Sequence, residues 1–365
     1  MTSKDDIRQL LLNKKESEIL DKIKSEKTNV QIILDIAKND SEWKLRREAV
    51  KILGKAEVKE SIDLLKEILL KDHLTILRKA AAKALGCIGD EKGIPPLLSA
   101  LKSSKDPSII TEVACALGAL KAIEAVIILV SMLQTNTDGE IREHAAEALG
   151  LIGDPKGIDI LLEALNNDKE DWVRGRSAEA LGLIGDTKVV PDLLKALESD
   201  KGIGVSVKVA TALGRLKDKS AVQPLVDHLK KGVNVETRRA IVYALGEIGD
   251  KQAAEIFLEL LETDEDETVR YWACISLGFM KHKKAVNAIL KVLTEDSSVR
   301  VRRTAVLSLG QLEPKTKKVI SILDTVSKED TDDEVKEKAK ETITKLAKVH
   351  GYKNKTEMLK DMGIK

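Results

Sequence analysis

The sequence predicts an all-α protein, an α-solenoid of about ten stacked two-helix repeats with a 32-residue period. Three observations support this fold class. A Leu-Gly pair recurs every 32 residues without an insertion, apolar residues follow one another at spacings of three and four, and no segment alternates like a strand. We number nine repeats by their glycines, which are Gly54, Gly86, Gly118, Gly150, Gly182, Gly214, Gly246, Gly278 and Gly310.

Each repeat is predicted to contain two helices. In the second repeat, the second helix runs from about Leu77 to Ile88 and ends at Gly89, a residue suited to the left-handed cap position. Asp90 then opens the next helical region, whose sequence GIPPLLSALKS places two prolines in its first turn, where a missing N–H is tolerated. Because one helix pair cannot bury its apolar face alone, neighbouring repeats must stack.

The ends of the chain depart from the repeat. Residues 1–28 are expected to form N-terminal capping helices, residues 29–348 the repeat solenoid, and residues 349–365 a C-terminal tail or short helix. Thr342 occupies the tenth glycine position, in a helix with a polar side. Atypical end repeats of this kind close a stack, since their outer face has no neighbour.

The composition argues against several classes of protein. Of the 365 residues, 43% are hydrophobic but only 2% are aromatic, so the core must be mainly aliphatic. The 61 basic and 60 acidic side chains leave a net charge of +1, which argues against a globally basic nucleic-acid binder. We find no signal peptide, no transmembrane stretch, and no disulfide or zinc-site spacing among the three cysteines. We therefore expect a cytoplasmic protein without a membrane partner.

A family resemblance follows from the repeat motif. The unit VRxxAAxALGxIGD followed by a PLLxAL helix is clearest at residues 141–154 and 173–186. It resembles the HEAT-like repeat of the phycobilin-lyase (PBS lyase) type, over about residues 29–348. The resemblance implies a right-handed solenoid whose second helices line a concave face. The family includes chromophore lyase subunits, deoxyhypusine hydroxylase and many binding scaffolds, so it does not fix a function.

Catalytic motifs are not apparent. Deoxyhypusine hydroxylases carry His-Glu pairs that ligate two irons, but none of the five histidines here is followed by Glu. Walker, GxSxG and GxGxxG motifs are absent, and no Cys–His arrangement is visible in the repeat register. Cys274 falls in a core column and is interpreted as a packed thiol, as Phe257 is interpreted as a core side chain. We expect no enzyme activity, cofactor, metal or small-molecule substrate.

An arginine column has two interpretations. Arginine stands eight residues before the glycine in seven repeats, and Asp stands six residues earlier still in six. The column could bind phosphates, or it could pair with carboxylates between repeats, which we prefer because charged groups near a core are normally paired. The arginines are Arg46, Arg78, Arg142, Arg174, Arg238, Arg270 and Arg302.

The columns that the repeat leaves free lie 10, 7, 6 and 3 residues before each glycine and 1 after it, on one stripe of the second helix. In the first two repeats this stripe is basic and could attract nucleic acid, anionic lipid or an acidic peptide, although a merely solvated face is preferred. This basic patch comprises Lys44, Arg47, Lys51, Lys55, Lys79 and Lys83, with Trp43 at its edge.

In the fourth repeat the stripe is acidic and contains one histidine. Its members are Glu140, Glu143, His144 and Glu147, flanked by Glu112 and Glu179. Such groups suit several divalent ions, but the second histidine of a strong zinc motif is missing. An acidic face without metal is therefore favoured. Cys87 and Cys115 also occupy free columns, which we interpret as incidental.

Aromatic side chains gather on the stripe of the seventh and eighth repeats. Aromatic and arginine side chains on an open face are typical of protein-binding hot spots; the alternative is packing under a neighbouring repeat or the C-terminal tail. Trp172 could be an isolated second anchor. The predicted patch comprises Arg239, Tyr243, Tyr271, Trp272, Ile275, Phe279 and Leu307.

These observations predict a non-catalytic scaffold or adaptor that grips a protein or peptide on its concave face. Two alternatives stay open. One is a metal-dependent enzyme of the hydroxylase-like or lyase-like branch, although its ligand motifs are absent. The other is a nucleic-acid binder that uses the basic patch.

Overall fold

The computed structural model describes residues 3–364, apart from the side chain of Lys27, and this part of the chain is all-α. Its contacts divide the chain into two compact units, residues 1–186 and 187–365. The repeat pattern does not reveal this division, because Gly182 and Gly214 on either side of it keep the 32-residue spacing.

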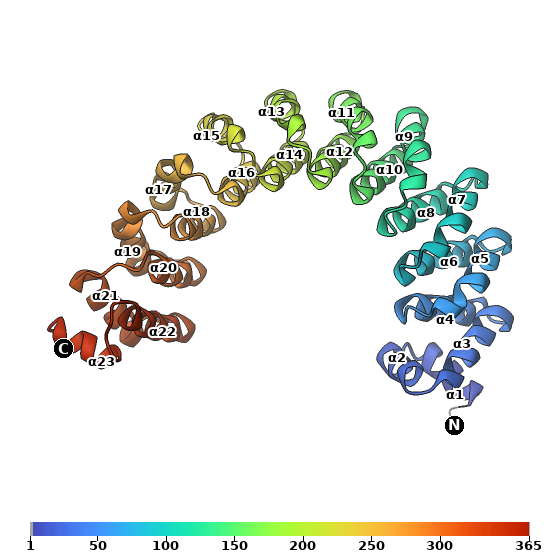
Figure 1. Ribbon diagram of the computed structural model, residues 1–365, viewed down its shortest axis with the longest axis horizontal. Helices are drawn as coiled ribbons and strands as arrows, with labels where there is room; N and C mark the ends of the chain where they lie inside the picture. The colour runs from blue at the N-terminus through green and yellow to red at the C-terminus, as the bar shows by residue number, and fades with distance from the viewer. Residues whose placement is uncertain (1–2, 365) are drawn as a thin grey trace. The chain divides into compact units, whose positions relative to one another are not determined.

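The first unit is a stack of helix pairs in two layers. The second helices of its repeats form one layer, in which α4, α6, α8, α10 and α12 pack in sequence (Figure 1). The α-helices are α1 (Lys4–Leu12), α2 (Glu16–Ser25), α3 (Lys27–Asn39), α4 (Trp43–Lys55), α5 (Ile62–Lys71), α6 (Thr75–Ile88), α7 (Ile94–Ser103), α8 (Pro107–Ala119), α9 (Val126–Thr135), α10 (Gly139–Ile152), α11 (Ile158–Asn167) and α12 (Asp171–Ile184). Short 3₁₀ turns lead into the first helices: η1 (Lys59–Ser61), η2 (Glu91–Gly93), η3 (Ile123–Ala125) and η4 (Pro155–Gly157).

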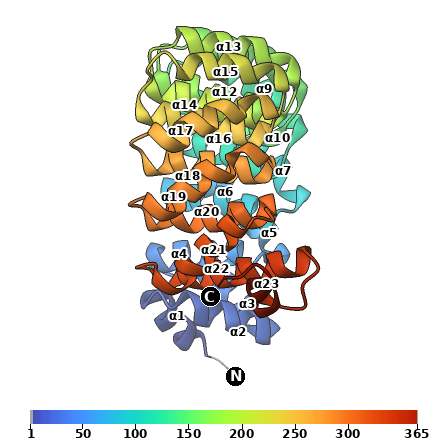
Figure 2. The same cartoon turned by 90° about the vertical axis from the view of Figure 1, so that its left-hand side faces the viewer.

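The second unit has the same construction. Figure 2 shows α16, α18, α20 and α22 one below another, in the order in which they pack. The α-helices are α13 (Val190–Ser199), α14 (Ile203–Leu216), α15 (Val222–Leu229), α16 (Val235–Ile248), α17 (Ala254–Thr263), α18 (Glu267–Phe279), α19 (Val286–Glu295), α20 (Val299–Leu312), α21 (Lys317–Glu329), α22 (Asp333–Val349) and α23 (Lys355–Asp361). The 3₁₀ turns are η5 (Thr187–Val189), η6 (Lys219–Ala221), η7 (Lys251–Ala253) and η8 (Lys283–Ala285).

The helix ends follow the chemistry expected of their sequences. Helix α6 ends at Ile88, and Gly89 after it adopts a left-handed conformation with φ of 70°. The side chain of Asp90 accepts a hydrogen bond from the backbone N–H of Lys92 and so caps η2. Both prolines lie in the first turn of α7. The predicted end of α6 and the roles of Gly89 and Asp90 are therefore confirmed, and the helix begins at Thr75, two residues before the predicted start.

The glycine column exists because neighbouring second helices touch. A Cβ built on Gly54 would lie 2.7 Å from the Cα of Ala84, and one built on Gly150 would lie 2.6 Å from the Cα of Ala180. Non-bonded carbon atoms do not approach so closely, so any larger residue would push the helices apart. The 32-residue recurrence of glycine is thus a packing requirement.

The core between the layers is aliphatic. The leucines that precede the glycines are buried, as Leu53 and Leu149 illustrate. Phe257 and Cys274 are both fully buried, which confirms their placement in core columns. Burial raises the pKa of the Cys274 thiol to about 12, so this cysteine stays protonated and inert at neutral pH.

The arginine column pairs with carboxylates, as the structural interpretation predicted. Five of the seven arginines reach the aspartate that follows the first helix of the next repeat, and most of these groups are largely buried. The column is therefore not available as a phosphate-binding ladder. The pairs are Arg46–Asp72, Arg142–Asp168, Arg238–Asp264, Arg270–Asp296 and Arg302–Asp330.

Candidate functional site

Within each unit, side chains of neighbouring second helices meet at fixed positions. At three places the residue three before one glycine contacts the residue six before the next glycine, an offset of 29 residues. Functional side chains that stand in the free columns of adjacent repeats can therefore contact one another. Three contacts of this kind are Cys115–His144, Glu147–Arg176 and Tyr243–Trp272.

Three rings and one guanidinium form an aromatic cluster on α16, α18 and α20. The ring of Trp272 lies edge-on to Tyr243, with centroids 4.9 Å apart, and edge-on to Tyr271 at 5.0 Å. The guanidinium carbon of Arg300 lies 3.9 Å from the ring centroid of Tyr271, a cation–π distance. All three rings are half-buried, so they are supported by the stack and still present atoms to solvent.

The remaining apolar residues of the predicted patch lie on the same stripe. Ile275 is half-buried on α18. Phe279 is 69% exposed and follows Trp272 by seven residues, two helical turns, so both lie on one helix face. Leu307 on α20 is 44% exposed. Phe279 in particular is more exposed than a side chain that serves packing alone.

Arg239, which the sequence also places in this patch, is held by its own neighbour. Its guanidinium forms a two-pronged ion pair with Asp266, with Nε 2.9 Å from Oδ1. The hydrogen bonds from Arg239 lower the pKa of Asp266 to about 2. Arg239 therefore orients the start of α18, and its charge is already balanced.

Arg300 was not among the predicted patch residues, although a signal for it exists. It stands ten residues before Gly310, which is one of the free columns. The predicted patch contains the aromatic residues and the arginine beside them in the seventh repeat. Arg300 lies in the ninth repeat, two repeats away from that arginine, and its side chain extends over Tyr271.

The basic patch of the first two repeats is partly neutralised. Glu48 pairs with Arg47 at 2.6 Å and with Lys51 at 3.1 Å, and Lys55 pairs with Glu16 at 2.6 Å. Trp43 is 39% exposed, with the cations of Lys44 and Arg47 at 5.9 and 5.6 Å from its ring centroid. No ion pair within residues 3–364 involves Lys44, Lys79 or Lys83. The patch thus has fewer free cations than its sequence indicates.

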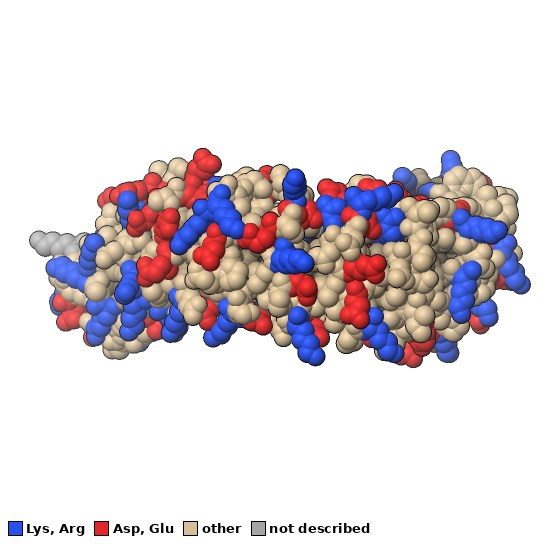
Figure 3. Space-filling model, turned by 90° about the horizontal axis from the view of Figure 1, so that it is seen from above, with Lys and Arg blue, Asp and Glu red and all other residues tan. Residues whose placement is uncertain are grey.

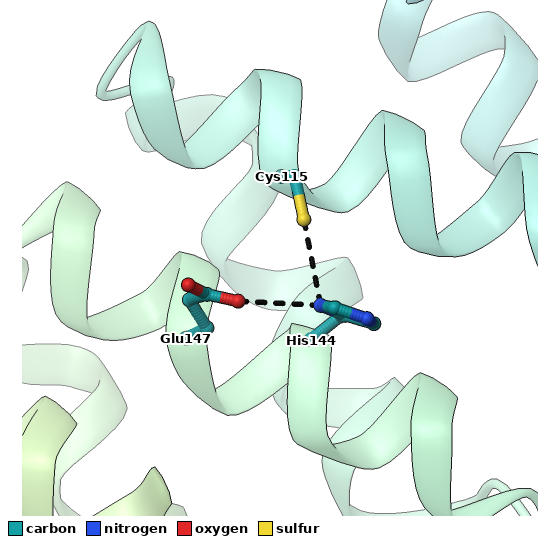
Figure 4. Close-up of side chains that lie close together, drawn as sticks. All are labelled: Cys115, His144 and Glu147. Carbon is teal, nitrogen blue, oxygen red and sulfur yellow. Dashed lines mark hydrogen bonds and ion pairs between the residues drawn. The ribbon is translucent and has the colours of Figure 1, made fainter. Parts of the chain in front are cut away.

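A cluster of Cys115, His144 and Glu147 joins α8 to α10, and we call it the Cys–His–Glu cluster. The Sγ of Cys115 lies 3.4 Å from Nδ1 of His144, and Oε2 of Glu147 lies 3.2 Å from the same nitrogen. Figure 4 shows both contacts ending on this one ring atom, with the thiol reaching across from the neighbouring helix. All three side chains are partly exposed.

This arrangement corrects the expectation that no Cys–His pairing is present. The two residues are 29 positions apart, three before Gly118 and six before Gly150, so they meet through the same contact as Tyr243 and Trp272. Cys87 remains an exposed thiol on α6.

The surroundings of His144 favour its protonated form. The hydrogen bonds to Cys115 and Glu147 outweigh partial burial and raise the pKa of His144 to about 10. On the other side of Glu147, Oε1 lies 3.8 Å from Arg176 of α12. Arg176 also pairs with Glu143 at 3.0 Å, so the acidic stretch of the fourth repeat is tied into a charge network.

Acidic and basic side chains are interspersed over the face shown in Figure 3. This distribution agrees with the near equality of 61 basic and 60 acidic residues. None of the helices within residues 3–364 combines the length and the apolar character needed to cross a membrane.

Comparison with protein families identifies HEAT repeats along most of the chain. Overlapping matches cover residues 30–118, 94–182, 126–205, 158–246, 190–278 and 254–344. The protein therefore belongs to the HEAT-repeat family, and the fold class predicted from the sequence is confirmed. No curated protein sequence matched the chain.

Solved structures share the fold. Importin β aligns with 15% identity over 87% of this chain and 51% of its own, with a TM-score of 0.58. The complex of CpcE and CpcF of phycocyanin lyase from Nostoc sp. aligns with 23% identity over 65% of this chain and 92% of that one, with a TM-score of 0.41. Human deoxyhypusine hydroxylase aligns with 21% identity over 70% and 96%, with a TM-score of 0.33. At these identities the likeness concerns the fold alone.

Proposed function

We propose that the protein is a non-catalytic cytoplasmic scaffold that binds a protein or peptide through the aromatic cluster of the 187–365 unit. The binding surface would be the face of the second helices, which the family resemblance implies is concave. The observation that supports this proposal most is the combination of supported rings at Tyr243, Tyr271 and Trp272 with the exposed ring of Phe279. Rigid aromatic anchors beside exposed apolar surface are typical of binding hot spots.

The construction of the stack argues against a packing role for these aromatics. The core of the repeats is filled by Leu, Ile, Val and Ala, and the glycine column sets the distance between helices. The cluster lies outside these columns, so the stack does not need its rings.

The nucleic-acid alternative has weaker support. Arg47, Lys51 and Lys55 are each engaged by a carboxylate. A phosphate backbone is bound through many unpaired cations, and each intramolecular pair would have to be broken first.

The proposal is tested by comparing captured proteins between variants. Tagged wild-type protein, Phe279→Glu and Trp272→Ala would be used to capture partners from the native lysate, with quantitative mass spectrometry of the bound fraction. Phe279→Glu changes an exposed side chain, so it should remove the specific partner while leaving the helical circular dichroism intact. Trp172→Ala is the matched control, because Trp172 is 49% exposed and lies in the other unit. Identical bound fractions for wild type and Phe279→Glu would refute the proposal.

A further inference from the structure

We propose that Cys115, His144 and Glu147 form a binding site for one zinc ion. The site would use the Cys115 thiolate, Nδ1 of His144 and one carboxylate oxygen of Glu147. It lies in the 1–186 unit and does not depend on the aromatic cluster of the other unit.

Three possible ligand atoms lie close together. The ligand atoms of the three residues all lie within 4.8 Å of one another. Zinc bonds of about 2.3 Å to sulfur and about 2.0 Å to nitrogen or oxygen, at tetrahedral angles, place neighbouring ligand atoms roughly 3.3–3.6 Å apart. The observed separations are 3.4 Å from Sγ to Nδ1 and 3.2 Å from Nδ1 to Oε2. Two of the three separations therefore already match a zinc site, and the third, from Sγ to the carboxylate oxygen, is at most 4.8 Å.

The three groups are not arranged like a catalytic triad. In a triad the imidazole contacts the nucleophile through one nitrogen and the carboxylate through the other. Here both Cys115 and Glu147 face the same nitrogen, Nδ1, as Figure 4 shows. Only one hydrogen can lie on that nitrogen, so the three groups cannot form a relay. A cation in their midst would instead satisfy all three ligand atoms.

The chemical identity of the three groups, and of Arg176 behind them, also favours zinc. Thiolate, imidazole and carboxylate are the three zinc ligands used in proteins, and three protein ligands leave one position for water or a further ligand. Arg176 lies 3.8 Å from the second oxygen of Glu147 and is itself fixed by Glu143 and Glu179. Such outer groups orient a ligating carboxylate.

The elements that carry the ligands are rigidly spaced. Cys115 projects from α8, and His144 and Glu147 lie one turn apart on α10. The two helices are in close contact at the glycine column, where a Cβ on Gly118 would lie 3.0 Å from the Cα of Ala148. The thiol is thus held against the α10 ligands by backbone packing, and a metal ion is not needed to assemble them.

The test measures metal uptake by tag-free, full-length protein. After removal of metal with a chelator, Zn²⁺ would be titrated by calorimetry, and Co²⁺ would be added to a second sample as a spectroscopic probe. We expect one Zn²⁺ per chain. For Co²⁺ we expect a thiolate-to-cobalt charge-transfer band, together with visible bands of the intensity typical of tetrahedral coordination.

Variants identify the ligands. Cys115→Ser, His144→Gln and Glu147→Gln should each lower the Zn²⁺ affinity at least tenfold, and Cys115→Ser should abolish the charge-transfer band. Cys87→Ser is the matched control, since it removes an exposed cysteine from the neighbouring helix α6 and should leave both signals unchanged. Circular dichroism of each variant reports its folding, and the Zn²⁺ affinity of Glu147→Gln decides between the outcomes if Cys115→Ser fails to fold.

Three results would overturn the proposal, and the first two concern Zn²⁺ uptake. One is the absence of stoichiometric Zn²⁺ uptake by the wild-type protein. The other is uptake that persists with unchanged affinity in Glu147→Gln and Cys115→Ser. Loss of the band in Cys87→Ser with retention in Cys115→Ser would show that the thiolate ligand is a different residue and would also reject this site.

Discussion

Arg142 and Asp168 form a two-pronged ion pair between consecutive repeats. Nε of Arg142 lies 2.7 Å from Oδ2 of Asp168, and a terminal nitrogen lies 2.8 Å from Oδ1. The remaining terminal nitrogen donates to the backbone carbonyls of Asn136 and Thr137. The side chains are only 8% and 7% exposed. The same pairing recurs along the column, so it is a regular connection of the stack.

Replacing Arg142 by Met should therefore destabilise the protein. The change leaves the carboxylate of Asp168 buried without its cation, and breaking a buried pair in this way costs about 3–5 kcal/mol. Urea unfolding followed by circular dichroism measures the effect. The control is Arg47→Met, which breaks a more exposed pair with Glu48 and should cost less than about 1 kcal/mol. Equal effects of the two changes would contradict a special role for the column.

The same pair predicts a dependence of stability on acid. Burial opposes ionisation of Asp168, but the hydrogen bonds from Arg142 outweigh it and lower the pKa of this carboxyl below its ordinary value. A lowered pKa in the folded state contributes stability above the unfolded value of about 3.9 and loses it as the pH falls through the folded pKa. Asp168→Asn should thus be less stable than wild type at pH 7, and the difference should shrink below about pH 4. Urea midpoints measured at neutral, mildly acidic and strongly acidic pH test this.

The glycine column predicts a contrast between two Gly→Ala changes. Gly150→Ala would bring a Cβ to 2.6 Å from the backbone of Ala180, so the helices must separate. We expect a loss of about 1–3 kcal/mol. Gly204→Ala is the control, because Gly204 lies in α14 with nothing within 4 Å of the added Cβ. That change should raise stability by about 0.5–1 kcal/mol through helix propensity. Opposite signs in thermal unfolding would support the packing explanation.

His144 predicts a pH dependence in the neutral to alkaline range. Cys115 of α8 and Glu147 of α10 raise the pKa of His144 to about 10. Arg176 of α12 lies on the far side of Glu147 and pairs with its other carboxylate oxygen. Because the folded pKa is raised, the stabilisation is complete below the unfolded value of about 6.5 and is lost as the pH rises towards 10. In metal-free buffer, His144→Gln should therefore be destabilised most at about pH 6. Its difference from wild type in free energy of unfolding should disappear by about pH 10. A difference in unfolding free energy that increases with pH would contradict this electrostatic description.

Zinc uptake should release protons. His144 is protonated at neutral pH without metal, since its pKa is about 10, and the ligand nitrogen must lose its proton before it can bind zinc. Calorimetry at neutral pH in two buffers of different ionisation enthalpy measures the number released, and the apparent affinity should increase with pH. An affinity that is independent of pH between about 6 and 8 would exclude His144 as a ligand.

The fold was predictable because its determinants recur. Glycine, leucine, arginine and aspartate occupy fixed columns, and a column repeated many times identifies both the helix face and its partner. The Arg–Asp pairing followed from this repetition, and the structure confirms it at Arg238 and Asp264. The division into units at residue 186 had no such signal, because the spacing is uninterrupted there.

The candidate sites were only partly predictable, because most of their residue types do not recur at the same position of the other repeats. Column positions placed Tyr243, Tyr271 and Trp272 on one stripe, but they did not state which columns touch. The contact between Cys115 and His144 depends on the 29-residue offset, which is set by how far one helix is shifted along the next. Arg300 was missed although it stands in a free column, because its contact with Tyr271 depends on the direction of its side chain.

The 29-residue contact has a consequence for how such a protein can acquire new chemistry. Cys115, His144 and Glu147 are followed 128 residues later, four full periods, by Tyr243, Trp272 and Ile275. The Cys115–His144 contact and the Tyr243–Trp272 contact are thus made by the same two positions of the repeat. The glycine and aliphatic columns set the distance between neighbouring helices. The side chains at these two positions are therefore expected to be replaceable without a change in helix packing. Tyr243→Cys, Trp272→His and Ile275→Glu together should reproduce the Cys–His–Glu cluster in the second unit, because these residues stand at the equivalent positions of their repeats.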